Sequence, residues 1–486
     1  MLFNKSFIAY VLGVLLIIEG SFMLMPGIVA IIYGEPDTPY HFISALVCCM
    51  AGSVLAFLFR NHERSFGRRD GYVIVSAVWI VFSLFGALPF WLSGALPSFT
   101  DAFYETMSGF TTTGSSVLTD IESAPHGILF WRSLTQWLGG MGIIMLSLAV
   151  LPMLGICGMQ LFSAESSGAM SDKLRPKISE VARRIWLIYT SLTIVQTLLL
   201  MLGGMSLFEA VCHSFSTLST GGFSTRNASL AAYDSAYIEY VVMLFMFVGG
   251  VNFALYYAIL LGKFNRLKFD DELKYFTVTT IALGLLGGIV IYFSTADAAL
   301  ENSVRDSLFL VLSVVTTTGF TTADYSMWPH ALVVIIAMLI VSGACTGSTS
   351  GGIKSIRFIV LLKTAYHELR QTLHPSAVIQ VKINGRSLSV ANLVNTVSFM
   401  AFFFSMIFVG MIFVSLWGYD FEDSYGLVAN SLANVGISVG NFGPSGPYTF
   451  ASLPDVLKWF LALLMLIGRL EIFTVALLFT GYFWKQ

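Results

Sequence analysis

Long apolar runs dominate this chain and alternate with short segments rich in Thr, Ser, Asn and Gly. All but the eighth run reach or approach the roughly 20 residues that a helix needs to cross a bilayer. The ten runs cover residues 7–33, 40–59, 72–96, 127–153, 183–205, 236–261, 275–293, 330–342, 390–417 and 455–483. The pattern predicts an all-α integral membrane protein with about ten transmembrane helices.

Four polar segments between these runs share one spacing. Each starts with an acid and reaches a glycine 13 residues later, with Ser108, Ser216, Ser313 or Asn430 at the seventh position. The acid–glycine pairs are Asp101 and Gly114, Glu209 and Gly222, Asp306 and Gly319, and Asp423 and Gly436. A helix that starts at the acid and stops before the glycine is about 15 Å long, half of a bilayer core. The sequence therefore predicts four re-entrant loops that enter, turn at a glycine and return.

These segments divide the chain into a leading hairpin and four units. The hairpin covers residues 1–69, and the units cover 70–180, 181–268, 269–386 and 387–486. Successive glycines lie 108, 97 and 117 residues apart, a spacing that indicates duplicated membrane modules. Each unit reads as a span, a short polar helix and a second span (M1–P–M2). Four such units around one axis would form a cation pore from a single chain.

The glycine turns are the candidate ion-binding residues. An acid suits the amino end of each short helix, and the carboxyl ends would point partial negative charge at the membrane centre. Backbone carbonyls beyond these ends can replace the hydration shell of an alkali cation. The expected lining is Thr112, Thr113, Gly114, Thr220, Gly221, Gly222, Thr317, Thr318, Gly319, Asn434, Val435 and Gly436.

The composition agrees with a membrane protein and orients it. Hydrophobic residues make up 56% of the chain and charged residues 11%, whereas about 25% of an ordinary soluble domain is charged. The net charge is only −2, but Lys and Arg gather on one side of the predicted topology. The exceptions are Arg132, Arg226, Arg305, Lys458 and Arg469. The bias predicts cytoplasmic termini and outward-facing re-entrant loops.

The eighth span is interrupted in a way that we expect in no other inner span. A Gly/Ser/Thr run at 342–352 follows its first part, and such a run is a poor helix former with little to offer lipid. We expect it to face a cavity and act as a movable plug; a cytoplasmic-side loop or a packing kink is the alternative. The candidate gate residues are Gly343, Thr346, Gly347, Ser348, Gly351 and Gly352.

Arg469 lies in the middle of the last apolar run. An arginine at membrane depth is costly and marks a functional position by default. We expect it to face the pore below the glycines as an electrostatic barrier. An ion pair with an acid on another helix, such as Glu19, is the alternative, because Glu471 two residues away does not share its helix face. Glycines at one inner-span level (Gly139, Gly140, Gly249, Gly250, Gly343 and Gly468) predict bends or close packing.

Other chemistry has little support in the sequence. The five cysteines form no Cys-x-x-Cys pair, and the seven histidines show no ligand spacing, so we expect neither a disulfide framework nor a structural metal site. Candidate catalytic side chains are scattered, which disfavours an enzyme. An ion-coupled secondary transporter (a symporter) with alternating access stays open as an alternative, because those folds also contain repeats and broken spans.

Several motifs together resemble the Trk/Ktr/HKT superfamily of potassium transporters, and within it the membrane subunit of bacterial Trk uptake systems. They are the TTTGSS, STGGF, TTTGF and NVGIS turns, GSTSGGIK after the third turn and GRLEIF in the last span. The resemblance covers essentially the whole chain. Plant members with serine at the first filter glycine favour sodium, and Gly114 here supports potassium. Asn434 departs from the threonine of the other turns.

The resemblance implies further properties. Potassium would be the transported ion, bound by backbone carbonyls of the selectivity filter, with no organic cofactor and no nucleic acid partner. The Gly343–Gly352 loop and Arg469 would form the gate. A homodimer in the bacterial inner membrane would be controlled by a cytoplasmic ring of nucleotide-binding TrkA-type subunits. Polar, partly basic segments at Ser163–Lys177 and Thr364–Arg386 are available to such a partner.

Overall fold

The computed structural model describes residues 4–61, 68–145, 178–294, 299–374 and 380–484, and these are mostly helical. The leading hairpin consists of α1 (Lys5–Phe22), α2 (Leu24–Tyr33) and α3 (Thr38–Leu58). It packs tightly because a Cβ at Gly13 would lie 2.7 Å from the carbonyl oxygen of Gly52. Gly34, with φ of +67°, ends α2 in a left-handed conformation and turns the chain back.

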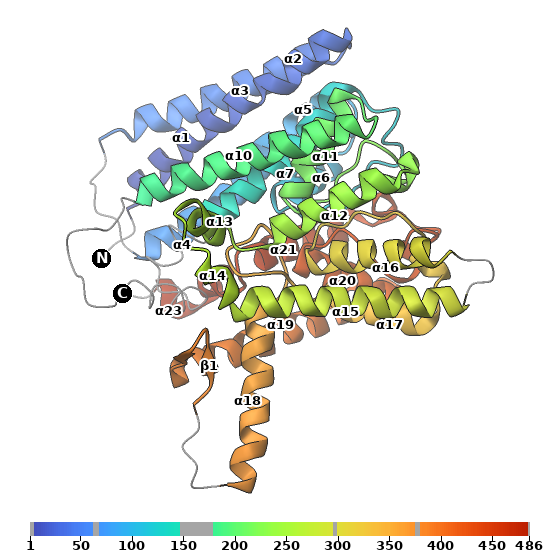
Figure 1. Ribbon diagram of the computed structural model, residues 1–486. Coiled ribbons are helices and arrows are strands. Elements are labelled where there is room, and N and C mark those ends of the chain that lie inside the picture. The colour runs from blue at the N-terminus through green and yellow to red at the C-terminus, as the bar shows by residue number, and fades with distance from the viewer. Residues whose placement is uncertain (1–3, 62–67, 146–177, 295–298, 375–379, 485–486) are drawn as a thin grey trace.

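Four units follow the hairpin, and each contains a helix of 12 to 16 residues that leads into a glycine turn (Figure 1). The first has α4 (Arg68–Gly86), α5 (Leu88–Leu92), α6 (Phe99–Phe110) and α7 (His126–Met145). The second has α10 (Ile178–Leu202), α11 (Leu207–Leu218), η2 (Ser229–Tyr233), α12 (Ala236–Gly250), α13 (Phe253–Leu260) and α14 (Asn265–Lys268).

The last two units repeat this order. The third has α15 (Asp271–Ser294), α16 (Leu300–Val315), η3 (Tyr325–Met327), α17 (His330–Ile340), α18 (Ser355–Leu373) and the antiparallel strands β1 (Lys382–Ile383) and β2 (Arg386–Ser387). The fourth has α19 (Val390–Ser415), α20 (Phe421–Ala433), η4 (Gly440–Phe442), η5 (Phe450–Ser452), α21 (Asp455–Arg469), α22 (Phe473–Ala476), η6 (Leu477–Phe479) and α23 (Gly481–Trp484).

The described helices confirm a multi-pass membrane protein. Six are long and apolar enough to cross a membrane, and the number is eight if each of two bent pairs counts as one span. The ten expected spans also include α7, whose predicted continuation to residue 153 lies outside the described residues, and α17, which has only 11 residues. The predicted partner segment Ser163–Lys177 lies outside the described residues as well.

The expectation that only one inner span is interrupted is wrong. The second inner span bends by 91° between α12 and α13, and the fourth bends by 111° between α21 and α22. Asn252 caps α13 by accepting a hydrogen bond from the backbone of Ala254, while Glu471 and Ile472 have φ of +57° and +40°. Both breaks occur within runs that are apolar as a whole, with one polar residue, Asn252 or Glu471, at the break itself.

The four short helices end where the sequence predicted, but one starts earlier. Acids lie in the first turns of α6, α11 and α20 (Asp101, Glu209 and Asp423). In contrast, α16 begins at Leu300, and its first-turn acid is Glu301. The prediction that Asp306 starts this helix is therefore wrong, because the polar turn from Glu301 to Arg305 is helical as well.

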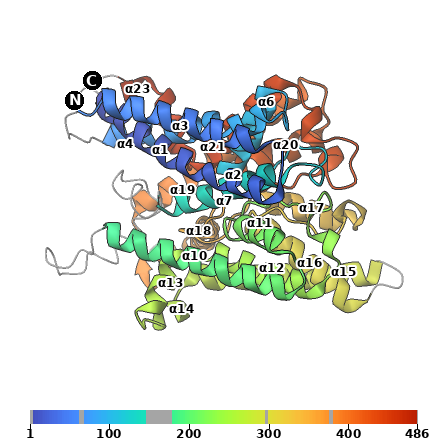
Figure 2. The ribbon, with the colours of Figure 1, turned by 90° about the horizontal axis from the view of Figure 1, so that it is seen from above.

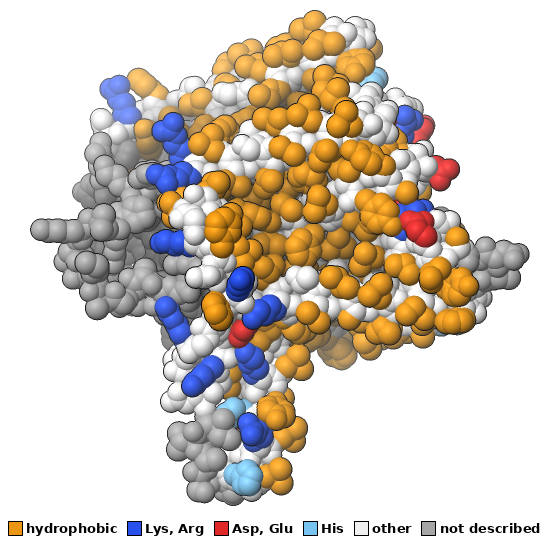
Figure 3. All heavy atoms as spheres, in the orientation of Figure 1, with side chains coloured by type: hydrophobic (Ala, Val, Ile, Leu, Met, Phe, Trp, Pro, Cys, Tyr) orange, Lys and Arg blue, Asp and Glu red, His pale blue; other side chains and the backbone are white. Residues whose placement is uncertain are grey.

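The outer surface has the distribution expected in a bilayer. Figure 3 shows an apolar band over the long helices, with Lys and Arg at one end and acids at the other. Many large apolar side chains of the long helices are exposed, for example Ile32 of α2 at 73% and Phe293 of α15 at 81%. Figures 1 and 2 place both termini at the basic end, with the long helices side by side around the short ones. Such an exposed apolar band fits contact with lipid.

Candidate functional site

The four glycine turns meet in a closed ring. A Cβ on Gly436 would lie 2.6 Å from the carbonyl oxygen of Thr113 in the first turn. The other three glycines each approach a carbonyl of the next turn in the chain. A Cβ on Gly114 would meet the Gly221 carbonyl, one on Gly222 the Thr318 carbonyl, and one on Gly319 the Val435 carbonyl. Each glycine thus packs against the residue that precedes the glycine of its neighbour. We call these four turns the glycine ring.

The backbone of the glycine ring is the same in all four units. Its glycines have φ between +78° and +88°. Two residues earlier, Thr112, Thr220, Thr317 and Asn434 have φ between +52° and +56°, while the residues between have negative φ. A left-handed conformation costs a residue other than glycine about 1–2 kcal/mol and, for β-branched Thr, marks strain of the kind found at functional sites. The alternation in φ turns successive carbonyls toward one side.

Burial distinguishes the glycines from their neighbours. Gly114, Gly222, Gly319 and Gly436 are each partly exposed, whereas the residues immediately before and after each of them are buried. Within each turn, the glycine is therefore the residue with partial exposure. The 12 residues predicted to line the path all lie in these four turns; that they line an ion path stays a prediction.

A backbone hydrogen bond fixes each turn to its short helix. In each turn, the N–H of the residue before the ring glycine donates to the carbonyl at the seventh position of the same repeat. The pairs are Thr113 to Ser108, Gly221 to Ser216 and Thr318 to Ser313, each over 2.8 Å, and Val435 to Asn430 over 3.2 Å. The seventh position of each predicted repeat thus supplies the acceptor. Two of these side chains also hold the returning chain: Ser313 Oγ donates to the Phe320 carbonyl, and Asn430 Oδ1 accepts from Gly436 N–H.

Buried polar side chains outside the repeats brace the ring from behind. Gln136 Nε2 donates to the carbonyl of Gly221 over 2.6 Å, and its Oε1 accepts from Phe223 N–H over 3.1 Å. Arg132 pairs with Glu105 at 2.6 Å and donates to the Ser224 carbonyl at 2.8 Å. Neither Gln136 nor the Arg132–Glu105 pair was singled out from the sequence. A polar residue in a predicted span was the available signal.

The inner-span glycines allow close approach to the short helices. A Cβ at Gly249 would lie 3.2 Å from the carbonyl of Leu218, and Cβ atoms at Gly139 and Gly468 would collide with carbonyls at the carboxyl ends of α6 and α20. These glycines pack closely, and Gly249, Gly250 and Gly468 also lie at the ends of helices that lead into the 91° and 111° bends. The carboxyl ends of the short helices carry partial negative charge, and all four lead directly into the glycine ring.

The Gly343–Gly352 loop lies against the inner side of this ring. Gly351 N–H donates to Thr317 Oγ1 over 2.7 Å, and Thr349 Oγ1 donates to the carbonyl of Leu218 over 3.0 Å. At its base, Gly343 N–H donates to the Ile353 carbonyl over 2.8 Å. The candidate gate residues Thr346, Ser348 and Gly351 are buried. The loop is therefore enclosed by protein at the depth of the ring and is neither exposed nor part of a continuous helix.

Arg469 joins this loop to the last span. Its Nη1 donates to the Thr349 carbonyl over 2.7 Å, and its Nη2 lies 3.5 Å from the Gly139 carbonyl. Within the described residues it forms no ion pair: Glu471 pairs with Arg357, and Glu19 contacts Cys48. Among the described residues, neither Glu19 nor Glu471 is therefore the ion-pair partner of Arg469. A positive charge held by carbonyls stands next to the loop.

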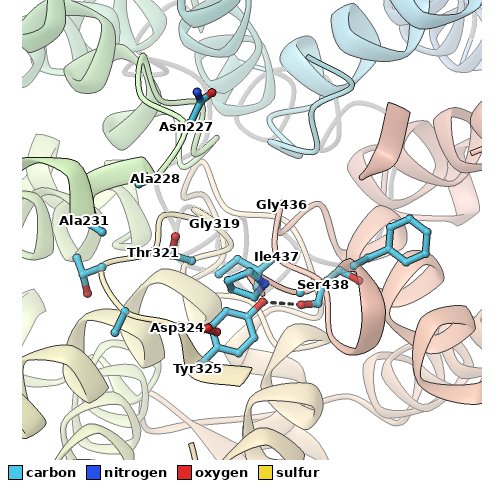
Figure 4. A pocket seen from close by; sticks show the side chains of 15 residues that line it. Asn227, Ala228, Ala231, Gly319, Thr321, Asp324, Tyr325, Gly436, Ile437 and Ser438 are labelled. Atoms are coloured by element: carbon cyan, nitrogen blue, oxygen red, sulfur yellow. Dashed lines mark hydrogen bonds between the residues drawn. The ribbon is translucent and has the colours of Figure 1, made fainter. Parts of the chain in front are cut away.

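A cavity of about 400 Å³ opens on the other side of the glycine ring (Figure 4). Gly319 and Gly436 form part of its wall, together with Asn227 and Asp324. Tyr325 Oη donates to the Ser438 carbonyl over 2.5 Å, which links the loops after the third and fourth turns. No group of three or more His, Cys, Asp or Glu side chains suited to a metal occurs among the described residues.

Repeated spans, re-entrant helices and a ring of backbone turns at membrane depth define the class of multi-pass cation transport proteins. The chain belongs to the TrkH family of cation transport proteins, whose family profile matches residues 38–486. This confirms the resemblance drawn from the turn motifs. It also agrees with the expectation of a transporter rather than an enzyme.

Individual relatives match over nearly the full length. The chain is 37% identical to the Trk system potassium uptake protein TrkH of Salmonella typhimurium, with 99% of each chain covered. It is 35% identical to the Trk system potassium uptake protein TrkG of Escherichia coli, with 99% of this chain and 98% of the relative covered. The crystal structure of the potassium transporter TrkH from Vibrio parahaemolyticus matches with a TM-score of 0.91 and 34% identity, over 99% of each chain.

Proposed function

We propose that this chain conducts potassium across the bacterial inner membrane through the axis of the glycine ring. The closed ring of four turns is the observation that carries the proposal. Its partly exposed glycines and buried neighbours leave the backbone as the surface that an ion meets. Carbonyl oxygens in this arrangement can replace the hydration shell of an alkali cation. The names of the relatives support potassium as that cation.

The selectivity filter in this proposal is the glycine ring, with the ion bound by carbonyls and with no organic cofactor. Gly114 supports potassium over sodium in the first turn. Asn434 takes the place of threonine in the fourth turn, but keeps the same left-handed backbone. Its Nδ2 donates to Thr113 Oγ1 and to the Met465 carbonyl, both over 2.9 Å. The asparagine thus ties the fourth turn to the first turn and to the last span.

The gate in this proposal is the Gly343–Gly352 loop with Arg469. In this proposal the loop obstructs the inner exit of the ring, and its hydrogen bonds to Thr317 and to the Leu218 carbonyl support that role. Arg469 adds a positive charge beside the same exit, which opposes a cation. Opening then requires the loop to leave its contacts with Thr317 and Leu218 and the Arg469–Thr349 bond to break.

The wider assembly belongs to the same proposal. We expect a homodimer with cytoplasmic termini, regulated by a cytoplasmic nucleotide-binding ring of the TrkA type. The clustering of Lys and Arg at the end that carries both termini supports this orientation. At that end α18 extends away from the helical body and leads into the predicted partner segment Thr364–Arg386 (Figure 1).

Rubidium uptake into proteoliposomes, with potassium and sodium as competitors, tests the proposal. In the parent, potassium but not sodium should block uptake. Gly114→Ser should weaken this discrimination, because its Cβ would meet the Gly221 carbonyl in a ring position with φ of +87°. Gly204→Ser is the matched control, since Gly204 has φ of +95° and nothing within 4 Å of the added Cβ.

Two results would contradict the proposal. Equal competition by both ions in the parent would remove potassium selectivity from the ring. Uptake that requires a proton or sodium gradient in a folded, partner-supplied protein would favour the alternative, an ion-coupled symporter with alternating access.

A further inference from the structure

A buried carboxylate on α15 contacts both the Gly343–Gly352 loop and the helix that follows the loop. Glu272, only 5% exposed, accepts three hydrogen bonds at Oε1. Two come from Thr346, from its N–H over 2.8 Å and its Oγ1 over 2.9 Å. The third comes from the N–H of Ile356, in the first turn of α18, over 3.1 Å. This one oxygen thus links Thr346 in the loop to the first turn of α18, the helix that follows the loop.

An ion pair fastens the same first turn of α18 to the last span. Arg357 Nη2 lies 2.6 Å from Glu471 Oε2, and both side chains are largely buried. The Arg357 guanidinium also stacks 3.7 Å from the ring centre of Phe399 on α19. Glu471 lies at the 111° break between α21 and α22, two residues after Arg469. Two residues beside this break therefore contact the loop region. Arg469 donates to the Thr349 carbonyl in the loop, and Glu471 pairs with Arg357 in α18.

These contacts join three elements that no local sequence pattern connects. Glu272 belongs to the outer span of the third unit, Arg357 to the helix after the loop, and Glu471 to the break in the fourth unit. Lys354, between the loop and α18, donates to the Ser350 carbonyl and, over 3.0 Å, to Ser350 Oγ. Charged hydrogen bonds in a buried site are strong and directional. Movement of α18 must therefore break them or carry the loop with it.

We infer that Glu272 and the Arg357–Glu471 pair are positioning residues that latch the Gly343–Gly352 loop beneath the glycine ring, so that α18 transmits movement to the loop. This inference rests on the proposed function of the loop as a gate. It assigns to α18 the role of a lever whose base is fixed at two points. Release of either point should let the loop depart from the ring without any change in the ring itself.

Cys345 is a natural reporter for this movement. It lies in the loop next to Thr346 and is 1% exposed, and its N–H donates to the Gly250 carbonyl over 3.0 Å. The experiment measures the rate at which a small, charged methanethiosulfonate reagent modifies Cys345 in the full-length protein in proteoliposomes. Mass spectrometry of the Cys345 peptide identifies the site, with Cys345→Ala as the blank. Rubidium uptake is measured on the same preparations.

Glu272→Gln and Arg357→Ala should each raise the Cys345 modification rate at least tenfold. Exchange of the pair, Arg357→Glu with Glu471→Arg, should bring the rate back toward that of the parent. Glu239→Gln is the matched control, because Glu239 is a buried acid paired with Arg305 at 2.7 Å on a distant helix. It should lower stability without exposing Cys345. If Glu272→Gln does not accumulate, Thr346→Val removes one donor to Glu272 with little change in shape and serves in its place.

The outcomes separate the latch from the gate. Faster modification together with faster uptake supports both. Faster modification of Cys345 with unchanged rubidium uptake supports the latch and contradicts the role of the loop as a gate. Parent-like protection of Cys345 in folded Glu272→Gln and Arg357→Ala overturns the latch, whatever the uptake. An equal rise in Glu239→Gln also overturns it, because general loosening would then explain the exposure.

Discussion

Arg469→Ala should open the pathway, and the size of the effect follows from its contacts. Arg469 donates to the Thr349 carbonyl over 2.7 Å, while Nη2 lies at the 3.5 Å limit from Gly139. A hydrogen bond from a charged group contributes about 1.5–3 kcal/mol. Since 1.4 kcal/mol is a factor of ten, its loss shifts the closed–open equilibrium by about 10- to 150-fold. Removal of the positive charge also lowers the barrier to a cation.

For the movement of the loop, we expect a shift of the closed–open equilibrium at the lower end of this range, about tenfold. Thr349 Oγ1 still donates to the Leu218 carbonyl over 3.0 Å, and Gly351 N–H still donates to Thr317. The loop therefore keeps part of its hold on the ring. We expect roughly tenfold faster initial uptake of rubidium into proteoliposomes that contain the variant alone, if the free energy of one charged bond is lost.

Arg469→Lys is the informative control. Lysine keeps the charge, but its single ammonium cannot reproduce the forked guanidinium geometry. Uptake that stays low in the lysine variant would assign the barrier mainly to charge, and uptake near that of the alanine variant would assign it to the Thr349 contact. Parent-like uptake in a folded Arg469→Ala protein would refute the reasoning, because neither the contact nor the charge would then limit the flux.

Three other changes test the ring and its support. Gly436→Ala places a methyl group 2.6 Å from a carbonyl of the first turn, so potassium-over-sodium discrimination in rubidium competition should fall at least as much as in the serine variant of the first turn. Gln136→Leu removes two hydrogen bonds at the second turn and, at about 1 kcal/mol each, should lower both thermal stability and selectivity; loss of neither would contradict its bracing role. Glu35→Gln should abolish the acid-induced loss of stability described next.

The pH effect at Glu35 has a defined sign. Burial acts to raise its pKa, but hydrogen bonds from the N–H groups of His126 and Gly127 and from the His126 ring lower the pKa below its ordinary value of 4.5. A lowered pKa means that the carboxylate stabilises the fold at neutral pH, and that this contribution disappears as the pH falls below about 4.5 through the folded-state pKa. Thermal unfolding of the parent and Glu35→Gln from pH 7 down to about pH 3, which passes below the ordinary pKa of 4.5, measures it. Parallel curves would contradict the assignment.

Much of the architecture could be predicted from local patterns. Apolar runs of bilayer length follow from the absence of water in the membrane core, which forces helices to satisfy their own backbone. The glycine turns were predictable because a left-handed backbone favours glycine, and four in register were visible by spacing alone. The interrupted eighth span was visible because a Gly/Ser/Thr run cannot continue an apolar helix.

The features that the sequence did not predict depend on contacts between distant parts of the chain. Val251, Asn252 and the residues after Arg469 lie in apolar sequence, so the bends in those spans depend on packing around the ring and on contacts from other units. The start of α16 at Leu300 was missed because polar residues that form ion pairs with α12, such as Arg305 with Glu239, resembled a loop. The roles of Gln136 and Glu272 could not be predicted, because their hydrogen-bond partners lie far away in the sequence.

The sequence by itself determined the class of protein, the four repeats and the residues of each turn, because membrane burial and left-handed backbone impose strong local requirements. Only the tertiary structure decided how the turns close into a ring, since each glycine meets a carbonyl of a different unit, and Gly436 of the last unit meets Thr113 of the first. It also decided the partners of the buried charges: Arg469 with the Thr349 carbonyl, Arg357 with Glu471, and Glu272 with Thr346 in the loop and Ile356 in α18. Such pairings depend on the packing of separate units, which no local pattern encodes.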